Sequence, residues 1–396
     1  MQHNAPYPDY AGHRSCRAFA ATALIGAGLL ALAATAQAQP APAPGVTLYG
    51  LMDASVEFLD KVNGVGRLNR MPSNTGMLPS RVGMRGSEDL GGGLRGVFTL
   101  EMGLAPDTGT SGQGGRLFGR QAFAGLAGPW GSLTLGRQYS MVYWSVIDAD
   151  LIGPAVYAMG SLDPYVPNAR ADNAVAWRGT FGHWNLGAEY SFGRDTVNAG
   201  PSPVGTNCPG ESGTDKQACR QWSALAKYDT PVWGVALGYD RQNGRTTSGP
   251  TDVVFGNLNS SDKHDSRASL GGYVKIAALG DTKVAGGLLR RDNDGDAVKP
   301  RSKLWYVGAS YPVSPFITVE GQWLALRYDG VDDRDSSMLV ARVVYSLSKR
   351  TAVYGQVGHI RNDRLAAVSV SGGAAGSNPA AGASQSGVNL GIRHTF

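Results

Sequence analysis

The segment VTLYGLMDASVEF occupies residues 46–58, and along most of its length apolar side chains alternate with polar ones. Successive side chains of a β-strand point to opposite faces of a sheet, so this segment predicts a strand with one apolar and one polar face. Residues 386–396, SGVNLGIRHTF, show the same alternation. Such strands suit either a soluble β-sandwich or a barrel whose apolar face meets lipid and whose polar face lines water.

The spacing of similar segments separates these two folds. Most have the roughly 9–11 residues that a tilted strand needs to cross a bilayer. Short connections, such as residues 91–93 and 128–130, alternate with long ones, such as 140–171 and 363–385. Outer-membrane barrels have this asymmetry, with turns at one end and long loops at the other. We therefore predict sixteen transmembrane strands, at residues 46–58, 80–89, 94–104, 116–127, 131–139, 172–182, 184–193, 221–230, 232–242, 265–280, 282–293, 301–312, 315–328, 336–347, 350–362 and 386–396.

Composition agrees with an exported barrel. The chain has 396 residues, and its 36 Lys and Arg against 31 Asp and Glu give a formal charge of +5. This small excess does not indicate a nucleic-acid partner. Hydrophobic residues make up 42% of the chain, which argues against a wholly disordered protein. Beyond the first forty residues no run of about 18 apolar residues occurs, which argues against helical membrane spans.

The N-terminal region predicts a secretory signal. Arg14 and Arg17 precede an apolar stretch at residues 18–34, and residues 36–38 read AQA, a small-x-small cleavage pattern. We expect a signal peptide at residues 1–38 and one barrel domain at residues 39–396. The two cysteines that remain, Cys208 and Cys219, favour a loop disulfide in an oxidising compartment over a metal-binding pair, since no histidine or second cysteine pair lies nearby.

Several ordered blocks carry a family resemblance. They are residues 46–50 followed by Asp53, residues 80–91, 118–123, 133–138 and 391–396. Together they resemble the trimeric general-diffusion porins of Gram-negative outer membranes, above all those of beta-proteobacteria. The resemblance implies an all-β fold, a 16-stranded antiparallel transmembrane β-barrel with a long third loop folded into the lumen. It also implies a homotrimer in outer-membrane lipid, passive diffusion of ions and small hydrophilic solutes, and a terminal Phe396 that the barrel-assembly machinery reads as an insertion signal.

Strand parity identifies candidate pore residues. Arg81, Arg85, Arg95 and Arg120 alternate with apolar side chains and should point into the lumen. The resemblance places Arg81, Arg85 and Arg120 in the basic ladder of the family. Arg137 falls on the same face as two leucines, so either it lies at a strand end or the register breaks there.

The connection at residues 140–171 is long and unusually apolar, which predicts burial inside the barrel. Its acids, Asp148, Asp150 and Asp163, are then expected to face the arginines across a constriction. The resemblance supports this role for Asp150. It also indicates that one carboxylate is missing, because residues 153–154 read GP where some members have Pro-Glu. We therefore predict a weakly anion-preferring pore.

Two other functions stay open, a substrate-specific channel on the same barrel and an outer-membrane barrel enzyme. An enzyme would need a converging acid, base and nucleophile, and no such set is visible. Residues 91–96 fit G-x-G-x-x-G but precede a strand, and residues 292–296 resemble a calcium loop that lacks its required Gly and final acid. Both read as turns, so we predict no catalysis, no cofactor and no metal site.

Overall fold

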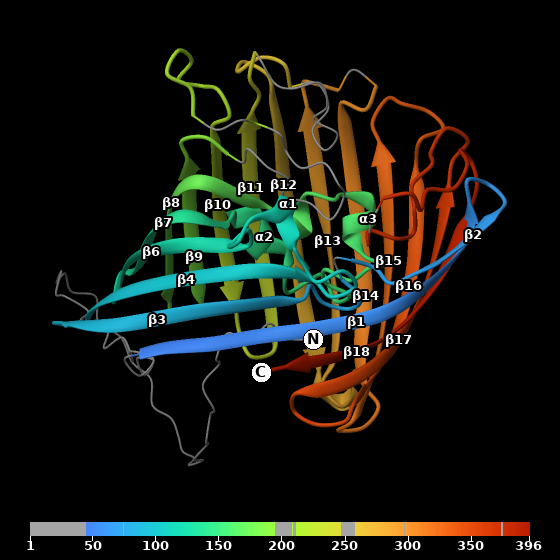
Figure 1. The fold of residues 1–396 in the computed structure, drawn as a ribbon, viewed down its shortest axis with the longest axis horizontal. Coiled ribbons are helices and arrows are strands. Elements are labelled where there is room, and N and C mark those ends of the chain that lie inside the picture. The colour runs from blue at the N-terminus through green and yellow to red at the C-terminus, as the bar shows by residue number, and fades with distance from the viewer. Residues whose placement is uncertain are drawn as a thin grey trace, which may run out of the picture.

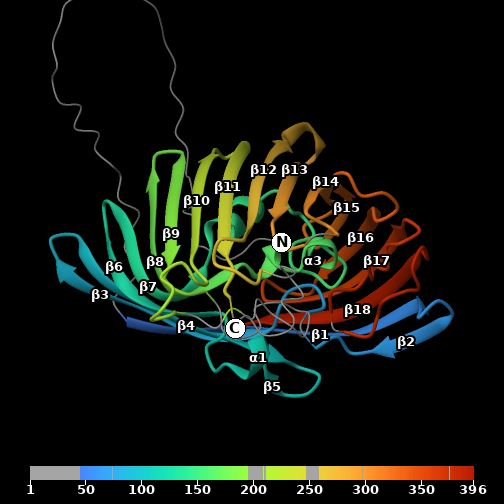
Figure 2. The same ribbon diagram turned by 90° about the horizontal axis from the view of Figure 1, so that it is seen from above.

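The computed structural model describes residues 45–73, 75–194, 208, 211–246, 258–296, 298–373 and 375–396. The predicted signal peptide lies outside these residues. Sixteen long antiparallel strands form a closed barrel (Figures 1 and 2), which confirms the predicted fold. The strands of the wall are β1 (Gly45–Val62), β3 (Arg81–Gly91), β4 (Leu94–Ala105), β6 (Gln121–Gly128), β7 (Gly131–Tyr139), β8 (Arg170–Phe181), β9 (Trp184–Ser191), β10 (Gln221–Asp229), β11 (Trp233–Asn243), β12 (His264–Ile276), β13 (Thr282–Asn293), β14 (Arg301–Pro312), β15 (Ile317–Tyr328), β16 (Ser336–Ser346), β17 (Thr351–Asn362) and β18 (Gln385–Thr395).

The first strand closes the ring. Residues 45–51 of β1 pair with β3, and residues 51–59 pair with β18, so both ends of the sheet are joined through one strand. A closed sheet has no unpaired edge, which a lipid environment requires. Two short strands, β2 (Gly66–Arg70) and β5 (Thr110–Ser111), lie in loops and extend β1 and β4 as hairpins.

The predicted strand boundaries agree with the structure to within a few residues at most positions. The exception is the predicted strand 116–127, because β6 begins at Gln121. The residues before it include the short helix α1 (Gly112–Gly115), whose Gln113 and Gly114 have positive φ angles. Residues 117–118 form a turn between α1 and β6, so the extended conformation that the pattern predicted from residue 116 begins only at Gln121.

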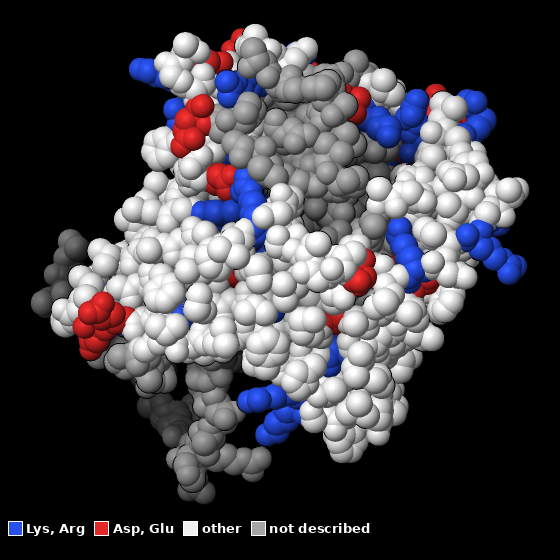
Figure 3. Space-filling model, viewed as in Figure 1, with Lys and Arg blue, Asp and Glu red and all other residues white. Residues whose placement is uncertain are grey.

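The two faces of the barrel differ as the alternation predicts. On β1, Val46, Leu48 and Phe58 are exposed on the outside, whereas Asp53 and Glu57 are buried inside. Figure 3 shows the face formed by β1, β3 and β4, where charged side chains are sparse across the middle and gather toward the rims. An apolar band between polar rims is the surface that a transmembrane barrel presents to lipid or to another subunit.

A β-bulge explains the position of Arg137. The pairing of β7 with β8 shifts register between Gly136 and Gln138, and Gly136 has a φ of +126°. One extra residue in the strand reverses the facing of every side chain beyond it. Arg137 therefore points inward although Leu133 and Leu135 on the same strand point outward. Of the two sequence alternatives, the broken register is the one the structure shows.

The main apolar core lies inside the barrel, where it packs the connection between β7 and β8 against the wall. That connection, the lumen loop (residues 140–169), contains α2 (Met141–Val146), α3 (Met159–Leu162) and the 3-10 turn η1 (Val166–Asn168). A second 3-10 turn, η2 (Ala277–Leu279), lies between β12 and β13. None of the helices formed by the described residues is long and apolar enough to span a membrane. Inward side chains of the wall that join the core are Leu289, Leu304, Tyr306, Leu324, Leu326, Met338, Val340 and Ile360.

Candidate functional site: the constriction inside the barrel

The lumen loop lies against one side of the inner wall. Helix α2 contacts β10, β11 and β12. Met141, Val142 and Val146 of this helix are buried, as are Val156 and Tyr157 farther along the loop. Figure 2 shows α3 within the ring of strands. The apolar character of the loop is therefore explained by burial on the wall.

Glycines on the wall make room for the loop. A Cβ atom on Gly238 of β11 would lie 2.2 Å from the Ser145 hydroxyl, and one on Gly187 of β9 would lie 2.5 Å from the Met141 sulfur. Such separations are far below van der Waals contact, so side chains at these positions would push α2 off the wall. The glycines thus fix how far the loop projects into the lumen.

The three acids of the loop bind the wall on which the loop rests. Asp163 pairs with buried Arg267 of β12 at 2.8 Å, and Asp148 pairs with Lys227 of β10 at 2.5 Å. Asp150 accepts a hydrogen bond of 2.8 Å from Gln322 of β15. These contacts are with β10, β12 and β15, and no ion pair among the described residues joins these acids to Arg81, Arg85, Arg95 or Arg120. Each acid of the buried loop has a polar partner on the adjacent wall, because an unpaired buried charge is costly.

The pKa values of two of these acids are shifted in opposite directions. Burial raises the pKa of the Asp150 carboxyl to about 6, and its hydrogen bonds with Gln322 and Gly153 only partly oppose this. Burial would raise the pKa of Asp163 as well, but the Arg267 guanidinium more than offsets it, so that pKa is lowered. Asp163 is accordingly a fixed anchor charge, whereas Asp150 changes its protonation near neutral pH.

Backbone atoms of the loop are held as firmly as its acids. Arg342 of β16 donates hydrogen bonds to the carbonyl oxygens of Ile152 and Leu151, at 3.0 and 3.3 Å. The Val156 N–H bonds to the carbonyl of Gly76, and the Gly372 N–H bonds to the carbonyl of Val156, both at 2.8 Å. The connections from β1 to β3 and from β17 to β18 therefore hold the lumen loop through backbone hydrogen bonds at Val156.

On the other side of the lumen, arginines gather around one tyrosine. Arg120 pairs with Glu101 of β4 at 2.6 Å and donates to the Tyr139 hydroxyl at 2.7 Å. Arg170, the first residue of β8, donates to the same hydroxyl at 2.5 Å. Arg81 lies 3.7 Å from Glu101. We call Arg81, Glu101, Arg120, Tyr139 and Arg170 the arginine cluster.

The remaining candidate arginines lie outside this cluster. The Arg85 guanidinium lies 5.4 Å from the centre of the Tyr49 ring, and Arg95 is half-buried on β4. Farther around the wall, Arg178 of β8 stacks on the Trp144 ring of α2 at 3.7 Å. Arg137 pairs with Asp172 at 2.7 Å. The arginines thus follow the wall from β3 to β8.

Sequence reasoning missed Arg170 and Arg267. Arg267 alternates with Asp265 on the polar face of β12, so parity could have assigned it to the lumen. Arg170 stands at a strand boundary, where alternation carries no information. Its contact with Tyr139 depends on the pairing of β7 with β8, which joins Tyr139 to Arg170 across the bulge.

An opening lies beside Arg120, between the arginine cluster and the lumen loop. No carboxylate lines it among the described residues; its lining consists of Thr75, Pro79, Gln113, Arg120, Pro154, Ala155, Gly160, Pro167, Asn168 and Gly372. The loop side of this opening is formed by small and neutral side chains. The lining thus contains the Arg120 cation and no acid among the described residues.

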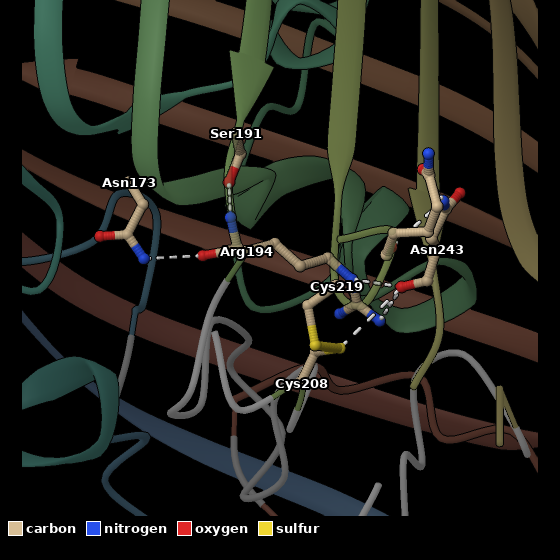
Figure 4. Close-up of a disulfide and its surroundings, with 8 residues drawn as sticks. Asn173, Ser191, Arg194, Cys208, Cys219 and Asn243 are labelled. Atoms are coloured by element: carbon tan, nitrogen blue, oxygen red, sulfur yellow. Dashed lines mark hydrogen bonds between the residues drawn. A yellow bond between two sulfur atoms is a disulfide. The ribbon is translucent and has the colours of Figure 1, made fainter. Parts of the chain in front are cut away.

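Cys208 and Cys219 are joined by a disulfide with a Cα–Cα distance of 5.6 Å. Figure 4 shows it beside Arg194 and the backbone carbonyl of Asn243. The Arg194 N–H bonds to the Cys219 carbonyl, and the Cys219 N–H bonds to the carbonyl of Gly244. The disulfide therefore lies where the connection from β9 to β10 meets the end of β11.

Phe396 lies at the seam of the barrel. Its backbone N–H and C=O each bond to Gly50 of β1, at 3.1 and 3.0 Å. The ring covers Gly50 so closely that a Cβ there would lie 2.2 Å from it. This residue is 45% exposed, on the outer face.

Comparisons with known proteins agree with this architecture. A family model described as Gram-negative porin matches residues 20–365. Outer membrane porin protein 32 of Delftia acidovorans is 28% identical over 364 residues, covering 89% of this chain and 94% of the relative. An outer membrane porin protein of Bordetella pertussis is 29% identical over 352 residues, covering 80% of this chain and 89% of the relative. A solved structure of an anion-selective porin from Comamonas acidovorans aligns with a TM-score of 0.71 at 24% identity, covering 89% of this chain and 99% of the other, and supports the fold.

Proposed function

Because the chain belongs to the Gram-negative porin family and is an outer-membrane channel for passive diffusion, we propose that its pore weakly prefers anions. The observation that carries this proposal is the opening beside Arg120, which has this cation on one side and no carboxylate on the other among the residues described. A porin forms no bonds, so its selectivity depends on the charges that surround the narrowest water.

The charges of the arginine cluster and of the lumen loop both support a preference for anions. The arginine cluster holds three guanidinium groups and one carboxylate, a net charge of +2. The acids of the lumen loop offset little of this charge, because Asp148 and Asp163 are paired with wall cations, which leaves Asp150, bonded to an amide, as the one loop acid among these three without an ion pair in the described residues. At about 0.1 M salt the Debye length is about 10 Å, so the cluster still acts across a narrow pore.

Reversal potentials in asymmetric KCl test the proposal. The purified protein in a planar bilayer should give a potential of the sign set by chloride, with a magnitude well below the ideal chloride value. Raising both salt concentrations at a constant ratio should reduce the preference, because screening shortens the range of the cluster. A cation-selective trace from the wild-type protein would contradict the assignment.

We also propose that the barrel assembles as a homotrimer, as the family resemblance implies. The broad uncharged band over β1, β3 and β4 supplies an outer face suited to a second subunit (Figure 3). Conductance that appears in steps of three, together with a mass of three chains in mild detergent, is the expected result. Single independent steps would argue for a monomer.

Two finer assignments complete the proposal. We propose that Phe396 serves as the signal for barrel insertion, and Phe396→Ala should slow assembly into bilayers by the insertion machinery more than Phe396→Tyr does. We further propose that the protein has no catalytic activity and serves general diffusion. Hydrolase activity in a detergent-purified sample would contradict the first point, and saturable block of conductance by one solute would favour a substrate-specific channel.

A further inference from the structure

A row of three cations crosses the outer face of the barrel at its loop end. Arg290 of β13 is paired in register with Lys303 of β14, and Lys303 is paired with Arg327 of β15. The row faces outward, because Trp305 and Val307 on the same face of β14 are exposed, whereas Leu304 and Tyr306 are buried inside. It lies next to the long connections that follow β13 and β15.

Repulsion among the three cations of the row destabilises the sheet unless an anion lies beside them. Neighbouring strands lie about 4.8 Å apart, and like charges directly opposite one another destabilise a sheet. The adjacent rung, by contrast, sets Asp292 against Arg301, which form an ion pair at 3.3 Å. A cross-strand acid therefore compensates the cation one rung away, whereas the three members of the row have only each other as cross-strand partners.

Loop carboxylates compensate only two of the three cations. Lys303 contacts Asp329 at 2.9 Å and Arg327 contacts Asp335 at 3.4 Å. Arg290 is exposed and has no acid partner among the described residues, so the row keeps a net charge of +1. Both ion pairs are partly exposed, and such pairs are weak enough for a stronger anion to replace them.

An apolar surface continues from the row toward the middle of the barrel. The next rung sets Leu288 beside Trp305 and Ala325, and Trp323 follows on β15. Trp305 is 46% exposed and Trp323 is 43% exposed. Cations above an aromatic and aliphatic surface match a molecule with a phosphate head and acyl chains, since arginine binds phosphate oxygens in pairs and tryptophan rings favour the headgroup boundary.

We propose that Arg290, Lys303 and Arg327 form a binding site for the phosphate group of an anionic lipid, whose acyl chains lie on Trp305 and Trp323. The ligand is a lipid and not a free phosphate, because the apolar surface below the row would gain nothing from an inorganic ion. The site is independent of ion selectivity, which depends on residues inside the barrel.

Native mass spectrometry of the full-length protein in a zwitterionic detergent tests the proposal. Dioctanoyl phosphatidic acid should bind, dioctanoyl phosphatidylcholine should not, and inorganic phosphate should compete only at far higher concentration. Each surface cation contributes on the order of a fivefold change in affinity for an anionic lipid. Arg290→Gln should weaken binding about fivefold, and neutralising all three residues should weaken it about a hundredfold.

The matched control is Arg361→Gln. Arg361 is an exposed cation of the same outer face, on β17, and it pairs with neutral Ser337. Its substitution should leave phosphatidic acid binding within twofold of the wild type. If the triple variant does not fold, Arg290→Gln alone still decides the outcome, because this exposed residue has no described partner to lose. Equal binding of phosphatidic acid by the wild type and Arg290→Gln would overturn the site, and inorganic phosphate that binds there as tightly as the lipid would overturn the lipid assignment.

Discussion

The wall from β3 to β8 and the wall from β10 to β16 both carry inward cations, but the two sets have different surroundings. Arg267 and Lys227 of the second wall pair with acids of the lumen loop, and Arg342 binds loop carbonyl groups. On the first wall, Arg81 and Arg120 share Glu101, Arg170 joins Arg120 at the Tyr139 hydroxyl, and Arg120 lines an opening. Cations that look alike in sequence therefore contact the loop on one wall and, in the function proposed above, set the field of the pore on the other.

The largest effect is expected from removing the buried anchor. Arg267→Met leaves Asp163 and Asp265 buried without their shared cation, and breaking such a pair costs about 3–5 kcal/mol of stability. The lumen loop should detach locally, which raises single-channel conductance and current noise. Recordings in planar bilayers measure both quantities.

Arg241→Gln provides the control for this variant, since Arg241 lies on the outer face of neighbouring β11 and pairs with Ser266. It should keep the wild-type conductance. If Arg267→Met also conducts like the wild type, the ion pair is not what holds the loop.

Neutralising the first wall should change selectivity and leave the loop in place. Arg81→Gln combined with Arg120→Gln converts the arginine cluster from a net charge of +2 to zero, so the reversal potential in asymmetric KCl should shift toward cations by several millivolts or more. Single-channel conductance should change less than in Arg267→Met. An unchanged potential would show that the cluster lies outside the path of the ions.

A smaller effect should follow from pH. Burial raises the pKa of Asp150 to about 6, so this carboxyl is mostly ionised at pH 7.5 and mostly protonated at pH 5. Acidification removes one negative charge beside Arg342 and Tyr306, and the anion preference should therefore increase as pH falls through 6. Reversal potentials across this range measure the change, and Asp150→Asn, which keeps the partner Gln322, should flatten it.

A pH profile that is the same in Asp150→Asn and in the wild type would assign the titration to another group. The Asp163 carboxyl serves as an internal contrast, because Arg267 keeps its pKa low and it stays ionised over the same interval. Only the acid without a cationic partner is expected to respond.

Alternation and loop spacing were enough to predict the strands, because both follow from the backbone geometry of a barrel. They also placed Arg81 and Arg120 inside. They failed where tertiary contacts override the period of two. The bulge at Gly136 turned Arg137 inward, and the inner faces of β14 and β15 became apolar under the lumen loop, at Leu304 and Leu324.

The partners of the loop acids could not be predicted for a different reason. Asp163 lies 104 residues from Arg267 in the chain, and Asp150 lies 172 from Gln322. Which part of the wall the loop rests on depends on where glycines leave room, as at Gly187 and Gly238. That fit is a property of three-dimensional packing and leaves no local pattern in the sequence.

The smallest effect on the pore should come from the disulfide, which contacts neither the lumen loop nor the arginine cluster. Its described contacts are with Arg194, Asn243 and Gly244, all outside the lumen loop and the arginine cluster. Replacing Cys208 and Cys219 with serine should leave the reversal potential unchanged. Because cross-linking restricts a loop mainly by removing its alternative conformations, trypsin should cut several-fold faster after exposed Lys216 in the variant than in the oxidised wild type. A shift in selectivity without faster cleavage would instead mean that the disulfide helps to position the charged residues of the pore. The contrast between the two walls would then have to include the connection from β9 to β10.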